Sequence, residues 1–317
     1  MGHEHHHHDH THGANKKVLM ISFFIITGFM IVEVIGGVIT NSLALLSDAG
    51  HMLSDSISLA VGLIAFTLGE RLANYGKTYG YKRFEILAAV FNGVILIGVS
   101  LYIFYEAYHR FFAPPEVASL GMLIIATIGL IVNIIVAWLL IRGGDTEENL
   151  NLRAVYLHVL GDLLGSIGAI VAAVLILIFQ WGWADPLASV IVAFLVLISG
   201  VRVTKDALHV LMEGTPKEID LENVIQKIKN VDGVLDLHDL HVWSITSGHH
   251  ALSAHVVVEG GMTINEGQII LQQLETTLSD EGIHHVTIQL ENKNHLHDAS
   301  ILCQAGMDVS REEKAEA

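Results

Sequence analysis

Long apolar stretches alternate with short polar connections over the first two thirds of the chain. Each of six stretches can cross a hydrocarbon core of about 30 Å, which takes about twenty helical residues. We place the transmembrane helices at residues 18–40, 43–68, 84–110, 120–141, 154–179 and 184–208. The connections at 40–42 and 180–183 are very short, so the helices that they join should form antiparallel hairpins.

Basic residues are distributed unevenly over the polar connections, and this distribution predicts the orientation. Lys and Arg in short loops are retained on the cytoplasmic side of a membrane. With the N-terminus inside, the outer segments hold only Arg110. The cytoplasmic segments then hold Lys16, Lys17, Arg71, Lys77, Lys82, Arg83, Arg142, Arg153, Arg202 and Lys205. We therefore expect a multi-pass protein of the cell membrane with both termini in the cytoplasm.

The chain changes character after Gly214 and Pro216, where a small soluble domain begins. Helical periodicity appears at 219–231 and 264–278, and strand patterns appear at 234–245, 251–258 and 286–290. This predicts an α-β-β-α-β domain with a short antiparallel sheet and helices on one face. The predicted divisions are a His-rich tail at 1–15, a transmembrane domain at 16–212, the α+β domain at 213–292 and a mobile acidic tail at 293–317.

Composition narrows the class of ligand. The formal net charge of -16 argues against nucleic acid as a partner, because such a partner needs clustered Lys and Arg. A cation is the more natural ligand for an acidic chain. The single cysteine, Cys303, cannot form an internal disulfide.

Two of the apolar helices carry the same polar motif. His51-Met-Leu-Ser-Asp55 lies in the second helix, and His158-Val-Leu-Gly-Asp162 lies in the fifth. An ionisable side chain at the bilayer centre costs roughly 2.5–3.5 kcal/mol even on a lenient scale, so something must offset that cost. Residues four apart lie on one side of a helix, about 6 Å apart along its axis. Each His and Asp pair therefore projects from one face.

The two motifs are also matched in depth. The second helix runs inward and the fifth outward, so His51 should lie level with Asp162, and Asp55 level with His158. Face to face, the pairs supply two imidazoles and two carboxylates, which suits tetrahedral Zn²⁺. The set contains too much nitrogen for Ca²⁺ or Mg²⁺, whereas Co²⁺, Fe²⁺, Mn²⁺ and Ni²⁺ remain compatible. We predict a metal transport site at these four residues.

Other interpretations of the intramembrane polar residues remain open. The four groups could form interhelical hydrogen bonds or salt bridges that hold the bundle together. Their duplication at matched depth favours the metal site. Asp48, about one turn outward from His51, either draws cations toward the exit or faces a wet vestibule. Asn133 in the fourth helix is expected to form an interhelical hydrogen bond.

Metal binding at such a site is linked to protons. Imidazole must be neutral and carboxylate ionised to bind a metal, so loading displaces protons and acid promotes release. A site exposed alternately to the two sides would exchange metal for protons. The phosphate-binding pattern Gly-x-x-x-x-Gly-Lys-Ser/Thr is absent, so we expect ion gradients, and not ATP, to drive transport.

Histidines also gather outside the apolar helices. Residues 3–12 contain seven histidines, a composition typical of metal binding, which we interpret as a flexible metal collector. An expression tag is the alternative, although interleaved Glu4, Asp9 and Thr11 are unusual in one. In the soluble domain, His238 and His255 lie on consecutive predicted strands, and we favour them as ligands over the other histidines there.

Three segments together resemble a known family. Ser47-Asp-Ala-Gly-His-Met-Leu-Ser-Asp55, Tyr79-Gly-Tyr-Lys-Arg-Phe-Glu85 and His158-Val-Leu-Gly-Asp162 are similar to the cation diffusion facilitators, especially CzcD-type bacterial zinc, cobalt and cadmium exporters. The resemblance covers about residues 16–292. It implies a homodimer in the lipid bilayer, six transmembrane helices per subunit, a cytoplasmic ferredoxin-like domain, and export of metal in exchange for protons. Whether K⁺ joins H⁺ as a counter-ion stays open.

The resemblance also assigns residues. The family's transport site falls on His51, Asp55, His158 and Asp162, and a histidine at position 51 is similar to zinc-preferring members. Members with Asp there select more broadly, including Cd²⁺. The family's cytosolic site maps onto His238, His255 and Glu291, while Gln289 takes the position of a third histidine. The resemblance therefore implies a regulatory Zn²⁺ at the cytosolic site, and it leaves the number of ions there open.

Two other classes of function are compared with a carrier. An intramembrane metalloprotease needs a general base beside its ligands, as in His-Glu-x-x-His, and Met52 and Val159 occupy that position here. The chain is therefore not expected to be an enzyme. A membrane metal sensor, which binds the ion but does not move it, is the remaining alternative.

Overall fold

The computed structural model describes most of the chain and divides it into two compact units, Met1–Ala207 and Leu208–Ala317. The described residues are 9–68, 74–143, 149–293 and 301–302, with side chains omitted at 9–19, 62, 65–68, 137, 139–143 and 149–162. The His-rich stretch 3–8 and most of the predicted C-terminal tail lie outside the described residues.

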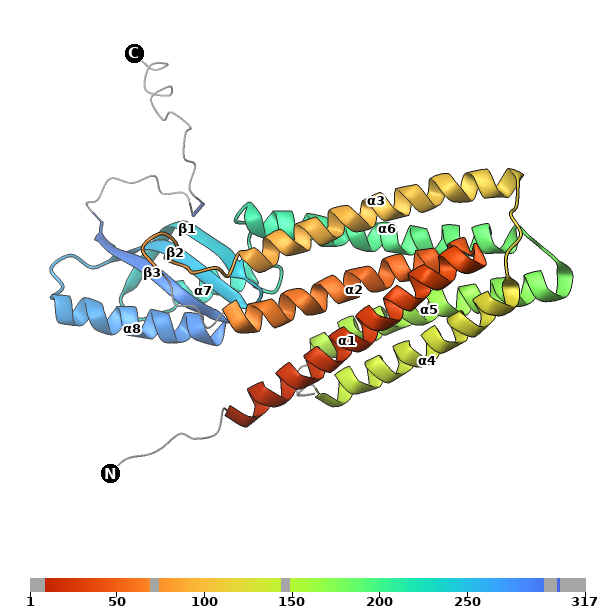
Figure 1. The fold of residues 1–317 in the computed structure, drawn as a ribbon. Helices are drawn as coiled ribbons and strands as arrows, with labels where there is room; N and C mark the ends of the chain where they lie inside the picture. The colour runs from red at the N-terminus through yellow and green to blue at the C-terminus, as the bar shows by residue number, and fades with distance from the viewer. Residues whose placement is uncertain (1–8, 69–73, 144–148, 294–300, 303–317) are drawn as a thin grey trace, which may run out of the picture. The chain divides into compact units, whose positions relative to one another are not determined.

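The first unit is made of long helices (Figure 1). They are α1 (Asp9–Thr40), α2 (Leu43–Leu68), α3 (Phe84–Phe112), α4 (Ser119–Gly143), α5 (Asn149–Phe179) and α6 (Ala184–Leu211). Each contains the greater part of one predicted range, and α1 and α5 begin earlier than expected because helical structure continues into polar sequence. The hairpin connections at 41–42 and 180–183 lie where the sequence placed them.

Four described helical segments are long and apolar enough to cross a membrane. A fifth, Leu163–Phe179, is apolar but shorter. The chain is therefore a membrane protein with a helical spanning domain, whereas six complete spans stay a prediction. The four segments are Met20–Thr40, Phe84–Phe112, Ser119–Val136 and Ala184–Leu211.

Helices α1, α2, α4 and α5 pack in a ring of contacts, α1 with α2 and α4, and α5 with α2 and α4. Helix α3 packs against α2 and pairs with α6 on one side of this group (Figure 1). A Cβ atom added at Gly93 would lie 2.9 Å from the carbonyl oxygen of Gly200. These two glycines therefore allow the close approach that is common between membrane helices.

The polarity of the helical unit is inverted relative to a soluble bundle. Large apolar side chains such as Phe24, Ile39 and Phe91 are exposed on the helix surfaces. Polar and acidic side chains such as Glu33 and Asp48 are buried. Apolar side chains also fill much of the interior, so what distinguishes the unit is its apolar surface together with buried ionisable groups, an arrangement that suits a hydrocarbon solvent.

One buried carboxylate, Asp185 at the start of α6, joins the ends of three helices. It accepts hydrogen bonds from Ser42 Oγ at 2.7 Å and from the amides of Leu43 and Ala44 at 2.8 and 3.1 Å. These amides are among the donors that a helix N-terminus leaves unsatisfied. Arg110 of α3 lies 3.9 Å from Asp185. This network fixes the start of α2, and hence the position of its ligands.

The second unit contains α7 (Leu221–Lys229), β1 (Val234–Thr246), β2 (His249–Val258), α8 (Ile264–Asp280) and β3 (Ile283–Asn292). The order of the elements is the predicted α-β-β-α-β. The sheet order is β1-β2-β3, with β1 and β2 antiparallel. The expectation of a wholly antiparallel sheet was wrong, because β3 runs parallel to β2. Helix α8 returns the chain to the end of the sheet where β2 begins, as a parallel pair requires.

One face of this sheet is packed against the two helices. Val224 of α7 and Leu274 of α8 share a core with Leu237, Leu252 and Val256 of the strands. Along β2, residues at alternate positions point into this core, so His255 lies on the opposite face.

Candidate metal sites

Helix α2 carries the first predicted ligand pair into the helical unit. Asp55 is 8% exposed, and His51 is half-buried one turn earlier. Helix α5, which carries His158 and Asp162, packs against α2. The side chains of those two residues lie outside the described part, so the meeting of all four ligands stays a prediction.

Hydrogen bonds from two other helices hold α2 at the level of this pair. Asn92 of α3 donates to Ser54 Oγ at 3.0 Å, and Thr27 of α1 donates to Ser56 Oγ at 3.1 Å. Ser54 and Ser56 flank Asp55 on either side. These bonds fasten α2 to α3 and α1 at the level of Asp55 and so limit rotation of the helix that carries the pair.

Two of the intramembrane interpretations are now decided. Asn133 of α4 donates to Ser166 Oγ of α5 at 3.3 Å, which confirms the predicted interhelical hydrogen bond. Asp48 is 1% exposed and accepts a hydrogen bond of 3.1 Å from Ser166 Oγ. It therefore lies inside the bundle, and the interpretation that it faces a wet vestibule was wrong.

The second unit brings His238, His255 and Glu291 together. One ligand atom from each lies within 4.8 Å of the other two. His255 Nδ1 is 2.9 Å from Glu291 Oε1, and His238 Nε2 is 3.3 Å from Glu291 Oε2. The two imidazole rings meet edge-on with centroids 5.3 Å apart. Two nitrogens and a carboxylate, all buried or half-buried, form a donor set that suits Zn²⁺.

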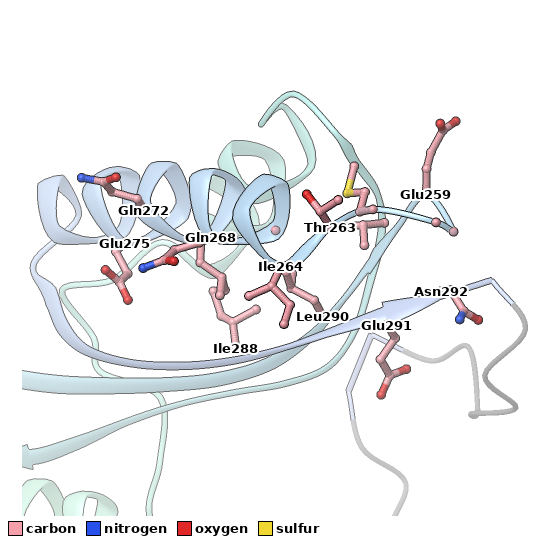
Figure 2. A pocket seen from close by; sticks show the side chains of 16 residues that line it. Glu259, Thr263, Ile264, Gln268, Gln272, Glu275, Ile288, Leu290, Glu291 and Asn292 are labelled. Atoms are coloured by element: carbon pink, nitrogen blue, oxygen red, sulfur yellow. The ribbon is translucent and has the colours of Figure 1, made fainter.

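Strand register explains why these three residues converge. His238 is paired with His255 across β1 and β2, and Glu291 is paired with Val257 across β2 and β3. All three point away from the helices, because core residues occupy the alternate positions. Figure 2 shows the Glu291 side chain on the side of β3 opposite α8, whereas Ile288 and Leu290 point toward α8.

Asp239 is a fourth residue at this cluster that the sequence reasoning missed. The pairing of β1 with β2 shifts between His238 and His241, and Asp239 there has a left-handed φ of 51°. This bulge turns its carboxylate back toward the cluster, where Oδ2 lies 3.6 Å from His255 Nε2. A β-bulge depends on cross-strand pairing, so only the adjacency of Asp239 to His238 could have suggested its role.

Gln289 orients the carboxylate rather than replacing a ligand. Its amide Nε2 donates to Glu291 Oε1 at 2.7 Å. Such a donor fixes the direction of a ligating carboxylate. The position that the resemblance gave to a third histidine therefore holds a group that supports the site from outside.

Three other described histidines of the second unit contact groups other than His238, His255 and Glu291. His241 is exposed and lies 3.3 Å from Asp239 Oδ1, and His284 Nδ1 lies 3.2 Å from Ser279 Oγ. His250 Nδ1 is 3.0 Å from Ser244 Oγ, and partial burial lowers the pKa of His250 below its usual value. The structure therefore brings together the two histidines that were favoured from the sequence.

A separate open pocket of about 820 Å³ lies between α8 and β3 (Figure 2). Amide and apolar side chains, including Gln268, Gln272 and Leu290, line most of it. Glu291 belongs to its lining, yet its carboxylate points to the other face of the strand. The pocket is therefore distinct from the candidate metal cluster.

Comparison with known proteins places both units in one family. Residues 19–212 match the family model of the cation efflux transmembrane domain, and residues 216–293 match that of the cation efflux protein cytoplasmic domain. The chain belongs to the cation efflux family, the cation diffusion facilitators. Its second unit is accordingly the cytoplasmic domain.

Several curated relatives match nearly the whole chain. The cadmium, cobalt and zinc/H⁺-K⁺ antiporter of Bacillus subtilis is 62% identical over 98% of this chain and 99% of that protein. The metal cation efflux system protein CzcD of Cupriavidus metallidurans is 44% identical over 92% and 90%. Zinc transporter ZitB of Escherichia coli is 39% identical over 91% of both. A solved metal-bound C-terminal domain of CzcD is 40% identical over 23% of this chain and 99% of that chain, with a TM-score of 0.21.

Proposed function

We propose that this protein exports divalent transition metal ions from the cytoplasm, with Zn²⁺ preferred and Co²⁺ and Cd²⁺ as further substrates. The observation that carries the proposal is the His51 and Asp55 pair. Asp55 is buried and His51 is half-buried on α2, which packs against α5, the helix that carries the matching pair. Membership of the cation efflux family and the names of the relatives support metal transport.

Protons serve as the counter-ion, with K⁺ as a second candidate. Protonation of the imidazoles and carboxylates competes with metal, so acid outside promotes release there. The name of the Bacillus subtilis relative, which includes H⁺ and K⁺, supports the same exchange. Alternating access of the transport site to the two sides, with both termini in the cytoplasm, couples the two fluxes.

The cytosolic cluster binds a single regulatory metal ion and acts on a homodimer. His238, His255 and Glu291 supply three ligands, Asp239 approaches as a fourth, and Gln289 holds the carboxylate. These ligands come from three strands, so bound metal fixes the register of the sheet. A stiffer cytoplasmic domain then favours the paired arrangement of two subunits when cytosolic metal is abundant.

Flux into liposomes tests the transport function. The purified protein is reconstituted with a fluorescent Zn²⁺ indicator inside, and Zn²⁺ entry is followed with and without an imposed pH gradient. We expect Asp55→Asn to abolish the flux, and His51→Asp to increase the rate of Cd²⁺ relative to Zn²⁺. Glu106→Gln, which removes a carboxylate that pairs with Arg110 at the outer end of α3, is the control and should transport normally.

Two outcomes would contradict this function. A Zn²⁺ flux that ignores the pH gradient would exclude proton exchange. Tight Zn²⁺ binding without any flux would favour a membrane metal sensor, which none of the compared proteins supports by name.

A further inference from the structure

A second group of polar side chains is buried in the helical unit beside the predicted transport site. Glu33 of α1 and Asp48 of α2 are 0% and 1% exposed. Asn133 of α4 and Ser166 of α5 are also buried. Asn133 donates to Ser166, which in turn donates to Asp48 Oδ2. The group thus draws one residue from each of four helices.

The surrounding helices leave room for these two carboxylates. A Cβ atom added at Gly129 of α4 would lie 2.8 Å from Glu33 Oε1. A Cβ atom added at Gly165 of α5 would collide with Asp48 Oδ1. Each carboxylate therefore points at a glycine, and any larger residue at either position would fill the space that the carboxylate occupies.

The surroundings of Glu33 indicate that this group binds a ligand. Both of its carboxylate oxygens are buried, and neither accepts a hydrogen bond from the described residues. Among the described residues, the charged group that acts on Glu33 is the like-charged Asp48. The side chains that are linked to Asp48 from α5 and α4, Ser166 and Asn133, are neutral. A buried carboxylate without donors, facing another carboxylate, is costly unless a cation neutralises it.

The donors available at this group are all oxygens. Two carboxylates, the Ser166 hydroxyl and the Asn133 amide oxygen form a set that suits hard cations. The predicted transport site instead includes two imidazoles, which suit Zn²⁺. The two sites therefore differ in the ions that they select, although Asp48 lies only three residues, about 4.5 Å of helix rise, outward from His51.

We propose that Glu33 and Asp48, with Ser166 and Asn133, form a second cation site that binds the monovalent counter-ion, a proton or K⁺. This rests on the proposed function, because a counter-ion is defined only for an exchanger. A proton or K⁺ bound about one helical turn outward from His51 adds positive charge there. This charge lowers the affinity of the transport site for a metal ion. Because coupling between two binding sites is reciprocal, bound metal at the transport site also lowers the affinity of the second site for the counter-ion.

The experiment uses the full-length protein in liposomes with Glu33→Gln, Asp48→Asn and the control Glu106→Gln. Zn²⁺ flux is measured in two arms, one with an imposed pH gradient at constant K⁺ and one with a K⁺ gradient at constant pH. A pH or K⁺ gradient should increase the Zn²⁺ flux of the wild type. We expect Glu33→Gln and Asp48→Asn to reduce this increase about tenfold. Zn²⁺ binding to the purified variants, measured by calorimetry, should persist, and acid or K⁺ should weaken it less than in the wild type.

The two arms distinguish the two cations, and either loss supports the site. Loss of stimulation in the pH arm identifies the proton, and loss in the K⁺ arm identifies K⁺. Variants that keep the wild-type response in both arms overturn the proposal. Loss of Zn²⁺ binding in Glu33→Gln also overturns it, since Glu33 would then belong to the metal site. Failure of the proposed function is a different result, namely a wild type that moves no Zn²⁺.

A milder variant covers the case in which Glu33→Gln fails to fold. Ser166→Ala removes one hydroxyl that donates to Asp48 and leaves both carboxylates in place. We expect it to raise the concentration of proton or K⁺ that gives half-maximal stimulation, with Zn²⁺ binding unchanged. An unchanged half-maximal concentration in both arms overturns the proposal.

Discussion

Single residues decide how the cytosolic cluster can bind metal. Glu291 is 7% exposed, and its two oxygens face two different histidines. Gln289 then fixes the carboxylate by donating to Oε1. An amide nitrogen in this position donates a hydrogen bond to the carboxylate and cannot itself act as a metal ligand.

Removing this support should weaken the cytosolic site without removing a ligand. We expect Gln289→Ala to lower Zn²⁺ affinity by about 10- to 100-fold, the usual cost of losing such a partner. Competition with a chelator measures this in protein whose transport site is silenced by His51→Ala and Asp55→Ala. The matched control is Gln272→Ala on α8, which lines the pocket on the other face of the sheet. Equal affinity for both variants would contradict the role of Gln289.

At the scale of elements, the ends of the helices carry the polar groups that position the sites. Asp185 satisfies the first amides of α2, and the bonds from Asn92 and Thr27 hold the same helix further along. In the cytoplasmic domain, Thr263 and Glu266 form a capping box at the start of α8. Helix α8 covers the core behind the metal-binding strands, so its cap contributes to the register of β3.

The capping box predicts a dependence on pH. Hydrogen bonds from the Thr263 amide and hydroxyl lower the pKa of Glu266 below its usual value of 4.5. Since the pKa is lower in the folded state, the cap stabilises α8 fully above that usual value and loses its effect as the pH falls through the folded pKa. We expect the protection of α8 amides from hydrogen exchange to decline between about pH 5 and 3.

Two variants test this cap. Glu266→Gln should remove most of the decline in protection, whereas Glu275→Gln, further along the same helix, should retain it. Thr263→Ala should lower the protection of the first turn about fivefold at neutral pH, as expected for the loss of an N-cap. A decline that is identical in Glu266→Gln and the wild type would rule out this carboxylate as its cause.

At the scale of the whole molecule, the two units suit different solvents. The apolar exterior of the helical unit suits hydrocarbon, and the buried apolar core of the cytoplasmic domain suits water. The helical unit buries Glu33, Asp48 and Asp55 and exposes large apolar side chains. The cytoplasmic domain instead buries a continuous apolar cluster behind its sheet. The uneven distribution of Lys and Arg over the loops predicts which side of the membrane receives the domain.

This orientation can be measured by cysteine labelling. With Cys303 replaced by Ser, we expect Glu116→Cys, in the exposed connection between α3 and α4, to react with a membrane-impermeant maleimide in intact cells. Asp232→Cys, between α7 and β1, should react only after the cells are permeabilised. Labelling of Asp232→Cys in intact cells would reverse the predicted topology.

The sequence by itself determined the features that depend on local order. Apolar runs predicted the six helices because a membrane helix satisfies its own backbone within one segment. The spacing of His51 and Asp55 predicted a shared face, because residues four apart lie on the same side of an α-helix. Motif similarity then indicated the cation efflux family, and the alternation in the last third of the chain predicted the order of α7 to β3.

The tertiary structure decided what depends on long-range pairing. The parallel β3, the bulge at Asp239 and the convergence of His238 with Glu291 follow from strand register, which no local pattern specifies. The approach of Asp48 to Ser166 and to Glu33 likewise required four helices to be packed. Buried polar groups reveal a second site only when their neighbours are known, because the cost of burial depends on which partners the fold supplies.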